Sequence, residues 1–257
     1  MKGIFTAILV CAVSSLLAGP APRRANPVLA PVPKLEEDGY DWNGRHEAIV
    51  REQKAINPDL VFVGDSLTHA WGGVPETGLS PQRRTGEAIA AKAFAGHRVL
   101  NCGFGWDRTQ NVLWRLDHGE LDGIQPKTVV VNIGTNNTTP TNNAGPCSPA
   151  EIAEGVLAVC DRVRAKCPAT KIVLMEIFPR WTPGHPGRAV IAEVNKRLAE
   201  AVKARSRGGE KIVLRDLAPA LLDDKGEFKP GVMAGDKTHL AAGGYEAWAK
   251  LIADELK

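Results

Sequence analysis

Residues 128–133 read TVVVNI, and this stretch is apolar at nearly every position. A continuous β-branched run is typical of a parallel strand covered on both faces, whereas alternating apolar and polar residues would indicate a strand with one solvent-exposed face. Similar short runs recur along the chain, at Leu60–Val63, Arg98–Leu100, Lys171–Ile177 and Lys211–Leu214. The sequence therefore predicts five buried parallel strands, of which Thr128–Ile133 is one.

Stretches with helical periodicity lie around these runs. Apolar residues recur every three or four positions in Asp41–Ile56, Glu151–Ala165, Ala189–Ala204 and Ala241–Leu256, which indicates amphipathic helices. Strands that alternate with helices predict an α/β fold, a three-layer α/β/α sandwich. We expect a flavodoxin-like five-stranded parallel sheet, with strand order 2-1-3-4-5. No internal repeat interrupts residues 41–257, so we interpret them as one domain.

The composition is that of an ordinary globular protein. The 257 residues are 44% hydrophobic and 24% charged, which excludes collagen, coiled coils, disordered tails and polytopic membrane proteins. The net charge of +3 comes from three basic residues in the first 25, without which 29 basic residues face 29 acidic ones. A neutral body binds polyanions poorly, so we expect no nucleic-acid partner.

The N-terminus has the pattern of a secretion signal. Lys2 precedes an apolar run at residues 4–13, which is short for a membrane span. We therefore predict a signal peptide at residues 1–25, a secreted or periplasmic protein, and no stable membrane insertion after cleavage. A retained membrane anchor is the alternative. Five prolines between residues 19 and 34 predict an extended segment, and we assign residues 26–40 to a proline-rich tether.

Four cysteines remain after such a cleavage. Cys147, Cys160 and Cys167 lie near one predicted helix, so in an exported protein they form a disulfide among themselves or stay reduced. Cys102 ends an apolar run, and we expect it to be a buried thiol. The chain contains no CxxC pair and no HExxH motif, so we expect no metal site.

Polar and glycine residues follow the predicted strands. In parallel sheets, ligands bind at the carboxyl ends of the strands, near the point where the strand order reverses. We expect the residues after the first and third strands, including Ser66 and Asn136, to lie side by side there. The sets are GDS at 64–66, NCGFG at 101–105, GTNN at 134–137 and DKTH at 236–239.

These residue types fit one catalytic arrangement. Ser66 is a weak nucleophile that needs a base, and His239 can take its proton while Asp236 orients the imidazole. An attacked carbonyl needs hydrogen-bond donors for its oxyanion, which Ser66 N–H, Gly103 N–H and the Asn136 amide can supply. Each residue alone also fits a turn or a helix cap, but four such sets at four strand ends favour catalysis. This chemistry requires no cofactor.

The same motifs resemble those of the SGNH (GDSL) hydrolase superfamily. Within it, the chain looks most like the α-subunits of brain-type platelet-activating factor acetylhydrolase and their bacterial relatives. The supporting stretches are VGDSLT at 63–68, NCG at 101–103, DRTQNVLWRL at 107–116, GTNN at 134–137, FPR at 178–180 and DKTH at 236–239. The resemblance covers residues 41–257. It implies Ser66 as nucleophile, Asp236 and His239 as its partners, and an oxyanion hole completed by Gly103 and Asn136.

Two features depart from the family pattern. Trp106 stands where many relatives have a smaller, glycine-richer turn, and the loop Thr138–Ser148 looks like an elaboration beside the site. Trp106 either narrows the acyl pocket, stacks on a sugar, or covers the core as a loop aromatic. We assign Trp106 and Asn137 to substrate binding.

The leading hypothesis is a secreted serine esterase for short acyl groups, above all acetyl. The resemblance supplies the acetyl group, and export favours decorated polysaccharide over another small-molecule ester as substrate. One alternative is a lysophospholipase or thioesterase for longer acyl chains. Another is a binding or scaffold module that kept the fold and lost catalysis, because the α-subunits that the chain resembles form protein assemblies. The same resemblance is compatible with a homodimer.

Overall fold

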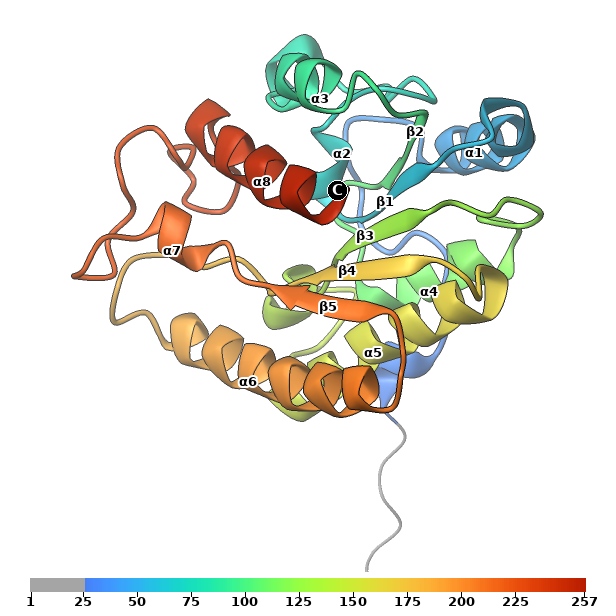
Figure 1. Cartoon of the computed structure of the whole chain (residues 1–257). Coiled ribbons are helices and arrows are strands. Elements are labelled where there is room, and N and C mark those ends of the chain that lie inside the picture. The colour runs from blue at the N-terminus through green and yellow to red at the C-terminus, as the bar shows by residue number, and fades with distance from the viewer. Residues whose placement is uncertain (1–25) are drawn as a thin grey trace, which may run out of the picture.

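The computed structural model describes residues 26–257, which form a single five-stranded parallel sheet between two layers of helices (Figure 1). The strand order is β2-β1-β3-β4-β5, so the predicted α/β/α sandwich and flavodoxin-like order are confirmed. All of β1 and β3 is buried, as their unbroken apolar runs require. The strands are β1 (Leu60–Gly64), β2 (Val99–Gly103), β3 (Thr128–Asn132), β4 (Lys171–Met175) and β5 (Ile212–Arg215).

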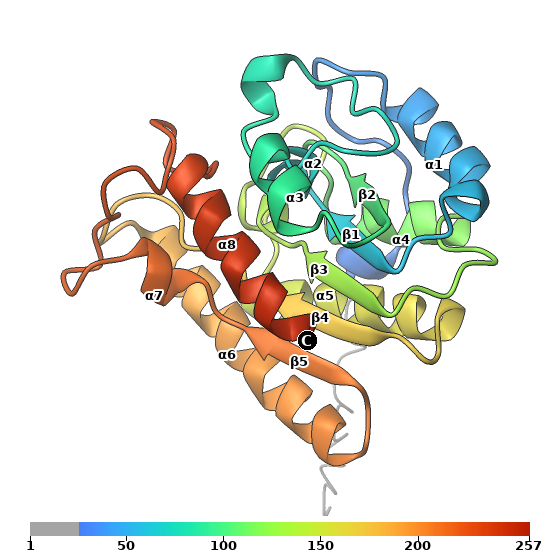
Figure 2. The same ribbon diagram turned by 45° about the horizontal axis from the view of Figure 1, so that its top comes forward.

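The helices divide between the two faces of this sheet. One hydrophobic cluster joins α1, α4, α5 and α6 to alternate strand residues, and a second joins α2, α3 and α8 to the others. Figure 2 shows α1, α2 and α3 near β2, at one edge of the sheet. The helices are α1 (Trp42–Ile56), α2 (Ser66–His69), α3 (Glu87–Ala93), α4 (Thr109–Asp117), α5 (Pro149–Lys166), α6 (Pro186–Arg207), α7 (Ala218–Leu221) and α8 (Ala242–Glu255).

Local sequence explains where the long helices begin and end. Asp41 caps α1 by accepting a hydrogen bond from Gly44 N, and Asn57, at φ 45°, ends it before a proline. Ser148 and Glu151 form a capping box at the start of α5, where a proline occupies the first turn. These signals place the observed helix ends within a few residues of the predicted ones.

Residues 26–40 differ from the expected tether, because they lie against the domain as an arm. The arm begins with a 3-10 helix, η1 (Pro27–Leu29), in which Val28 is fully buried. Asn111 Nδ2 donates to Pro33 O at 2.7 Å, and Val32 N donates to Gln110 O at 3.2 Å. The prolines do keep the backbone extended, but it extends along α4 and α5.

The cysteines also correct one expectation. Cys102, Cys147, Cys160 and Cys167 are all free thiols, so the disulfide expected as one option is not formed among residues 26–257. Cys102 is fully buried, as predicted. The predicted signal peptide lies outside the described residues. No helix within residues 26–257 has both the length and the apolar character needed to cross a membrane.

Candidate active site

Ser66 lies at the point where β1 passes into α2. Asp65 caps α2 by accepting a hydrogen bond from Leu67 N at 3.0 Å, which places Ser66 at the first helical position. Gly64 permits this turn, because a Cβ there would collide with Asn132 O of β3. The backbone N–H of Ser66, in the first turn of the helix, has no acceptor within residues 26–257.

His239 and Asp236 reach Ser66 from the loop before α8. Ser66 Oγ lies 2.9 Å from His239 Nε2, and His239 Nδ1 lies 2.6 Å from Asp236 Oδ2. Asp236 Oδ1 accepts from the backbone N–H groups of Thr238 and His239. The structure thus brings the three predicted side chains into one hydrogen-bonded chain across 173 residues of sequence.

The electrostatics of Asp236 suit this arrangement. Burial raises the pKa of Asp236, but hydrogen bonds from the side chain and backbone of His239 and from Thr238 N outweigh it, so the net pKa lies below the ordinary value. Asp236 is therefore a carboxylate at neutral pH, with the His239 Nδ1 proton facing it. That tautomer leaves His239 Nε2 free to accept the Ser66 hydroxyl proton.

Asn136 lies at the same end of the sheet as Ser66. It opens a 3-10 helix, η3 (Asn136–Thr138), directly after β3, which is hydrogen-bonded to β1 in parallel register. Its Nδ2 donates to Asp107 O at 2.9 Å. One of the two amide hydrogens is thus engaged, and the second remains for another acceptor.

Gly103 is not placed as predicted. Its N–H donates to Asn101 Oδ1 at 2.8 Å, so its single hydrogen is already used. A Cβ at Gly103 would collide with the backbone of Thr68 and His69, which explains the glycine by packing. Gly103 therefore holds the end of β2 close to α2 and offers no free donor to an oxyanion.

The turn Phe104–Asp107 presents a free donor in its place. Asp107 N donates to Phe104 O at 3.2 Å, and Phe104 N donates to Gly64 O at 3.0 Å, which keeps the turn beside the end of β1. The N–H of Trp106 in the middle of the turn has no acceptor within the described chain. Sequence reasoning chose Gly103 instead, because the sequence does not show that Asn101 Oδ1 already accepts from the Gly103 N–H.

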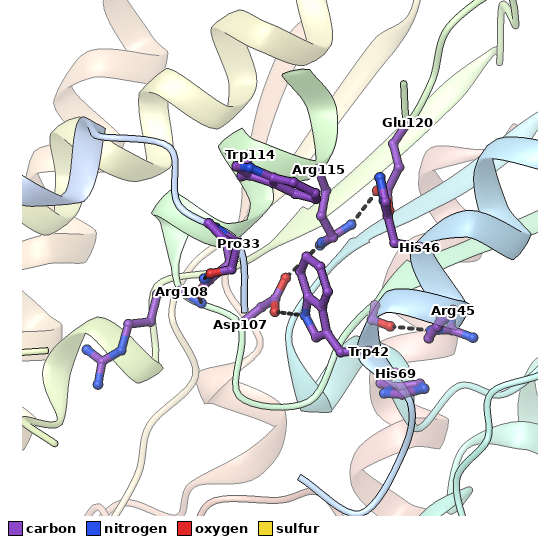
Figure 3. A network of polar contacts seen from close by, with 12 residues as sticks. Pro33, Trp42, Arg45, His46, His69, Asp107, Arg108, Trp114, Arg115 and Glu120 are labelled. Atoms are coloured by element: carbon purple, nitrogen blue, oxygen red, sulfur yellow. Dashed lines mark hydrogen bonds and ion pairs between the residues drawn. The ribbon is translucent and has the colours of Figure 1, made fainter. Parts of the chain in front are cut away.

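A buried charged network supports the turn (Figure 3). Asp107 accepts from Trp42 Nε1 at 2.7 Å and from Arg115 Nε at 2.8 Å. Arg115 also pairs with Glu120, whose other oxygen lies 3.0 Å from His46 Nδ1. Burial raises the pKa of Asp107 to about 6, against the opposing effect of Arg115. The network ties Asp107, the last residue of the turn, to α1 and α4.

The two predicted substrate-binding residues behave differently. Asn137 is fully buried, where its Oδ1 accepts from Thr109 N and its Nδ2 donates to Gln110 Oε1. Its assignment to substrate binding is therefore wrong, since it caps the start of α4. Trp106 is 41% exposed, which excludes the reading in which it covers the core.

Arg180 is a further residue near the site to which the sequence assigned no role. Its Nη1 donates to Thr135 O and Thr139 Oγ1, each at 3.1 Å, and its Nε donates to Thr238 Oγ1 at 3.3 Å. It thereby bridges the loop that carries Asn136 and the loop that carries His239.

A cavity of about 210 Å³ lies beside the loop that carries His239. It is lined by Arg83, Asp236, His239 and Tyr245, among others. Arg83 is neutralised by Asp38 of the arm, with Nη1 and Nη2 at 2.7 and 2.8 Å from the two carboxylate oxygens.

Within residues 26–257, no group of three or more His, Cys, Asp or Glu side chains is arranged to hold a metal ion.

Comparison with known proteins agrees with this geometry. Residues 62–247 match the model of the GDSL-like lipase/acylhydrolase family. The chain is 32% identical over 221 residues to the human platelet-activating factor acetylhydrolase IB subunit alpha1, covering 86% of this chain and 85% of that protein.

Solved structures share the fold. A GDSL-like lipase from Bacteroides thetaiotaomicron superposes with a TM-score of 0.62 at 19% identity, over 82% of this chain and 96% of that one. A mutant of Axe2, an acetyl-xylooligosaccharide esterase from Geobacillus, superposes with a TM-score of 0.60 at 17% identity, over 77% and 93% of the two chains. On the family match and the sequence identity, the chain belongs to the GDSL-like lipase/acylhydrolase family.

Proposed function

We propose that this acylhydrolase is an exported serine esterase that removes short acyl groups, above all acetyl, from its substrate. The observation that carries the proposal is the hydrogen-bonded chain from Ser66 Oγ through His239 to Asp236. This chain couples a hydroxyl nucleophile to a base whose tautomer is held by a carboxylate, the arrangement that acyl transfer to serine requires.

The reaction proceeds in two halves. Ser66 Oγ bonds to the ester carbonyl carbon while its proton passes to His239 Nε2, and the carbonyl oxygen becomes an oxyanion. The bond to the alcohol then breaks, and the alcohol leaves with the proton from His239. Water attacks the acyl-enzyme in the same way, giving its proton to His239, and Ser66 regains that proton as the carboxylic acid leaves.

Three donors stabilise the oxyanion in this scheme. They are Ser66 N–H and Trp106 N–H, neither of which has a protein acceptor within residues 26–257, and the second hydrogen of Asn136 Nδ2. Donors that are already in place act without reorganisation when charge develops on the carbonyl oxygen. Trp106 thus takes the place that the sequence assigned to Gly103.

The preference for acetyl rests on similarity to named relatives. The human relative is named an acetylhydrolase, and Axe2 is described as an acetyl-xylooligosaccharide esterase. Arg180 bridges the loops that carry Asn136 and His239, and so holds the two sides of the site together. The exposed Trp106 offers a flat apolar face for a sugar ring, which supports decorated polysaccharide as substrate.

Labelling and a substrate panel test this proposal. A fluorophosphonate probe is expected to label wild-type protein at Ser66 and to leave Ser66→Ala unlabelled. On p-nitrophenyl esters from acetate to palmitate, kcat/KM is expected to be highest for acetate and butyrate, and acetylated xylan should release acetate. Absence of labelling would indicate a non-catalytic scaffold. Equal kcat/KM for palmitate would instead indicate a lysophospholipase or thioesterase.

Export has its own test. The N-terminus of the protein purified from its native host is expected to lie between residues 18 and 26, after cleavage of the basic and apolar leader. Recovery of an intact Met1 in the membrane fraction would contradict export as a free protein and leave the esterase proposal standing.

A further inference from the structure

The turn that carries the Trp106 N–H has an unusual residue at its third position. Trp106 has φ 64°, while Gly105 is outside the left-handed region, and Asp107 N donates to Phe104 O. This is the φ signature of a type II turn, whose third residue is usually glycine. A bulky side chain with positive φ is disfavoured because Cβ approaches the backbone.

The alternative for such a sequence is a type I turn, in which both central residues have negative φ. The two turns keep the same end-to-end hydrogen bond but differ by a half-rotation of the central peptide, here Gly105–Trp106. A tryptophan by itself favours type I. In that form Trp106 N–H would point to the opposite side of the turn and would be lost to the oxyanion.

Tyr40 holds this peptide in its observed orientation. Tyr40 Oη donates to Gly105 O at 3.2 Å. In a planar trans peptide the carbonyl and the N–H point in opposite directions, so fixing Gly105 O toward Tyr40 directs Trp106 N–H away from it. Burial, together with nearby Asp107, raises the pKa of Tyr40, so its hydroxyl keeps the proton that it donates.

The hydroxyl of Tyr40 is itself held in place. Its ring packs edge-on against His69, with centroids 4.6 Å apart, and His69 Nδ1 accepts from Gly105 N at 3.1 Å. Burial lowers the pKa of His69 to about 2, so the ring stays neutral and keeps that acceptor. Asp38, bonded to Arg83, fills the space that a Cβ on Gly105 would need.

We propose that Tyr40, supplied by the arm, is a positioning residue that holds the Gly105–Trp106 peptide in the orientation that presents Trp106 N–H to the oxyanion. The inference rests on the proposed function and extends it to the segment before the first long helix. On this proposal the arm contributes to catalysis by positioning an oxyanion donor. The hydrogen bond from Tyr40 also explains how a tryptophan occupies a turn position that usually requires glycine.

A double-mutant cycle tests the proposal on the full chain. Tyr40→Phe keeps the ring and removes only the hydroxyl, and it is expected to lower kcat about threefold to tenfold, with KM unchanged, as the loss of one hydrogen bond to the peptide predicts. Glycine tolerates positive φ, so in a Trp106→Gly background the same change is expected to lower kcat less than about twofold.

Tyr245, the only other tyrosine, provides the matched control. Its hydroxyl also donates to a backbone carbonyl, Leu67 O, at 2.8 Å. Tyr245→Phe is expected to have the same effect on kcat whether residue 106 is tryptophan or glycine. Equal dependence on residue 106 for both tyrosine variants would mean that Tyr40 acts only through general stability.

The outcomes separate this inference from the proposed function. If wild-type protein neither labels with fluorophosphonate nor hydrolyses esters, the proposed function is wrong. If wild-type protein is active and Tyr40→Phe retains its kcat, or loses the same factor in both backgrounds, the positioning role is wrong and the esterase stands. A crystal structure of the phosphonylated wild type is expected to show the phosphonyl oxygen hydrogen-bonded to Trp106 N–H.

Discussion

Asn136 and Asn137 are adjacent in the chain but lie in different surroundings. Asn136 has one amide hydrogen available at the end of the sheet that carries Ser66, whereas both polar atoms of the Asn137 amide are used at the start of α4. Asn136→Ala is expected to lower kcat by about 10²–10³, or roughly 2.7–4 kcal/mol, with little change in KM, because the oxyanion exists only in the transition state.

Asn137→Ala serves as the neighbouring comparison. It leaves Thr109 N without its acceptor in a buried position, so we expect it to lower the free energy of unfolding by about 1–3 kcal/mol. Urea denaturation and steady-state kinetics measure the two effects. A normal kcat in Asn136→Ala would show that the amide does not act on the oxyanion.

The buried carboxyl group of Asp65 makes the folding stability depend on pH. It is fully buried, its Oδ2 has no partner within the described chain, and burial raises its pKa to about 7. The unfolded chain releases this proton near pH 4, whereas the folded chain keeps it until about pH 7. The contribution of Asp65 to the free energy of unfolding is therefore fully present below pH 4 and is lost as the pH rises through about 7.

Asp65→Asn removes that titration. The free energy of unfolding of wild type minus that of Asp65→Asn is expected to fall by up to about 4 kcal/mol between pH 4 and pH 8. Urea denaturation at a series of pH values measures this difference, in which the other titrating groups largely cancel. A difference that is constant with pH would show that Asp65 titrates normally in the folded state.

At the scale of elements, the arm behaves as part of the domain. Val28 is fully buried, and a Cβ on Gly155 of α5 would press against its side chain. Val28→Ala is expected to lower the free energy of unfolding by about 2 kcal/mol, through lost apolar burial and the cavity that remains.

Val74, which is 49% exposed, is the control for this change. Val74→Ala is expected to alter stability by less than about 0.5 kcal/mol. If Val28→Ala changed stability no more than Val74→Ala does, the arm would be the loose tether that its prolines suggest. Urea denaturation of both variants decides between a packed arm and a tether.

At the scale of the whole molecule, the core of residues 26–257 holds its fold without a disulfide among them. Two hydrophobic clusters lie one on each face of the sheet. The cluster that includes α1, α4, α5 and α6 contains the buried thiols of Cys102, Cys160 and Cys167. A chain that starts at residue 26 has four cysteines, and all four are expected to react with a thiol reagent after denaturation without reductant.

Dithiothreitol should correspondingly leave the Tm unchanged. Two reactive thiols instead of four, with a Tm that falls on reduction, would show that a disulfide forms in the oxidised protein. Because Cys160 and Cys167 are buried, the denaturing step is needed for the count.

The sequence by itself determined the parts of this protein that depend on local patterns. Unbroken apolar runs and helical periodicity predicted all five strands and the four longest helices. The GDS and DKTH sets predicted Ser66, His239 and Asp236, whose side chains form one hydrogen-bonded chain. These signals work because periodicity, capping and residue chemistry are properties of short segments. The shorter helices α3 and α4 span only seven and nine residues, and they were not predicted.

Only the tertiary structure decided which polar groups are free and which are already used. Gly103 N–H is taken by Asn101, Trp106 N–H is not, and Asn137 is buried against α4. It also decided that residues 26–40 pack onto the domain, since their hydrogen-bond partners outside the arm lie 45 to 128 residues away. The physical reason is the same in each case: a hydrogen bond is satisfied by whichever group the fold brings near, and sequence distance does not show that.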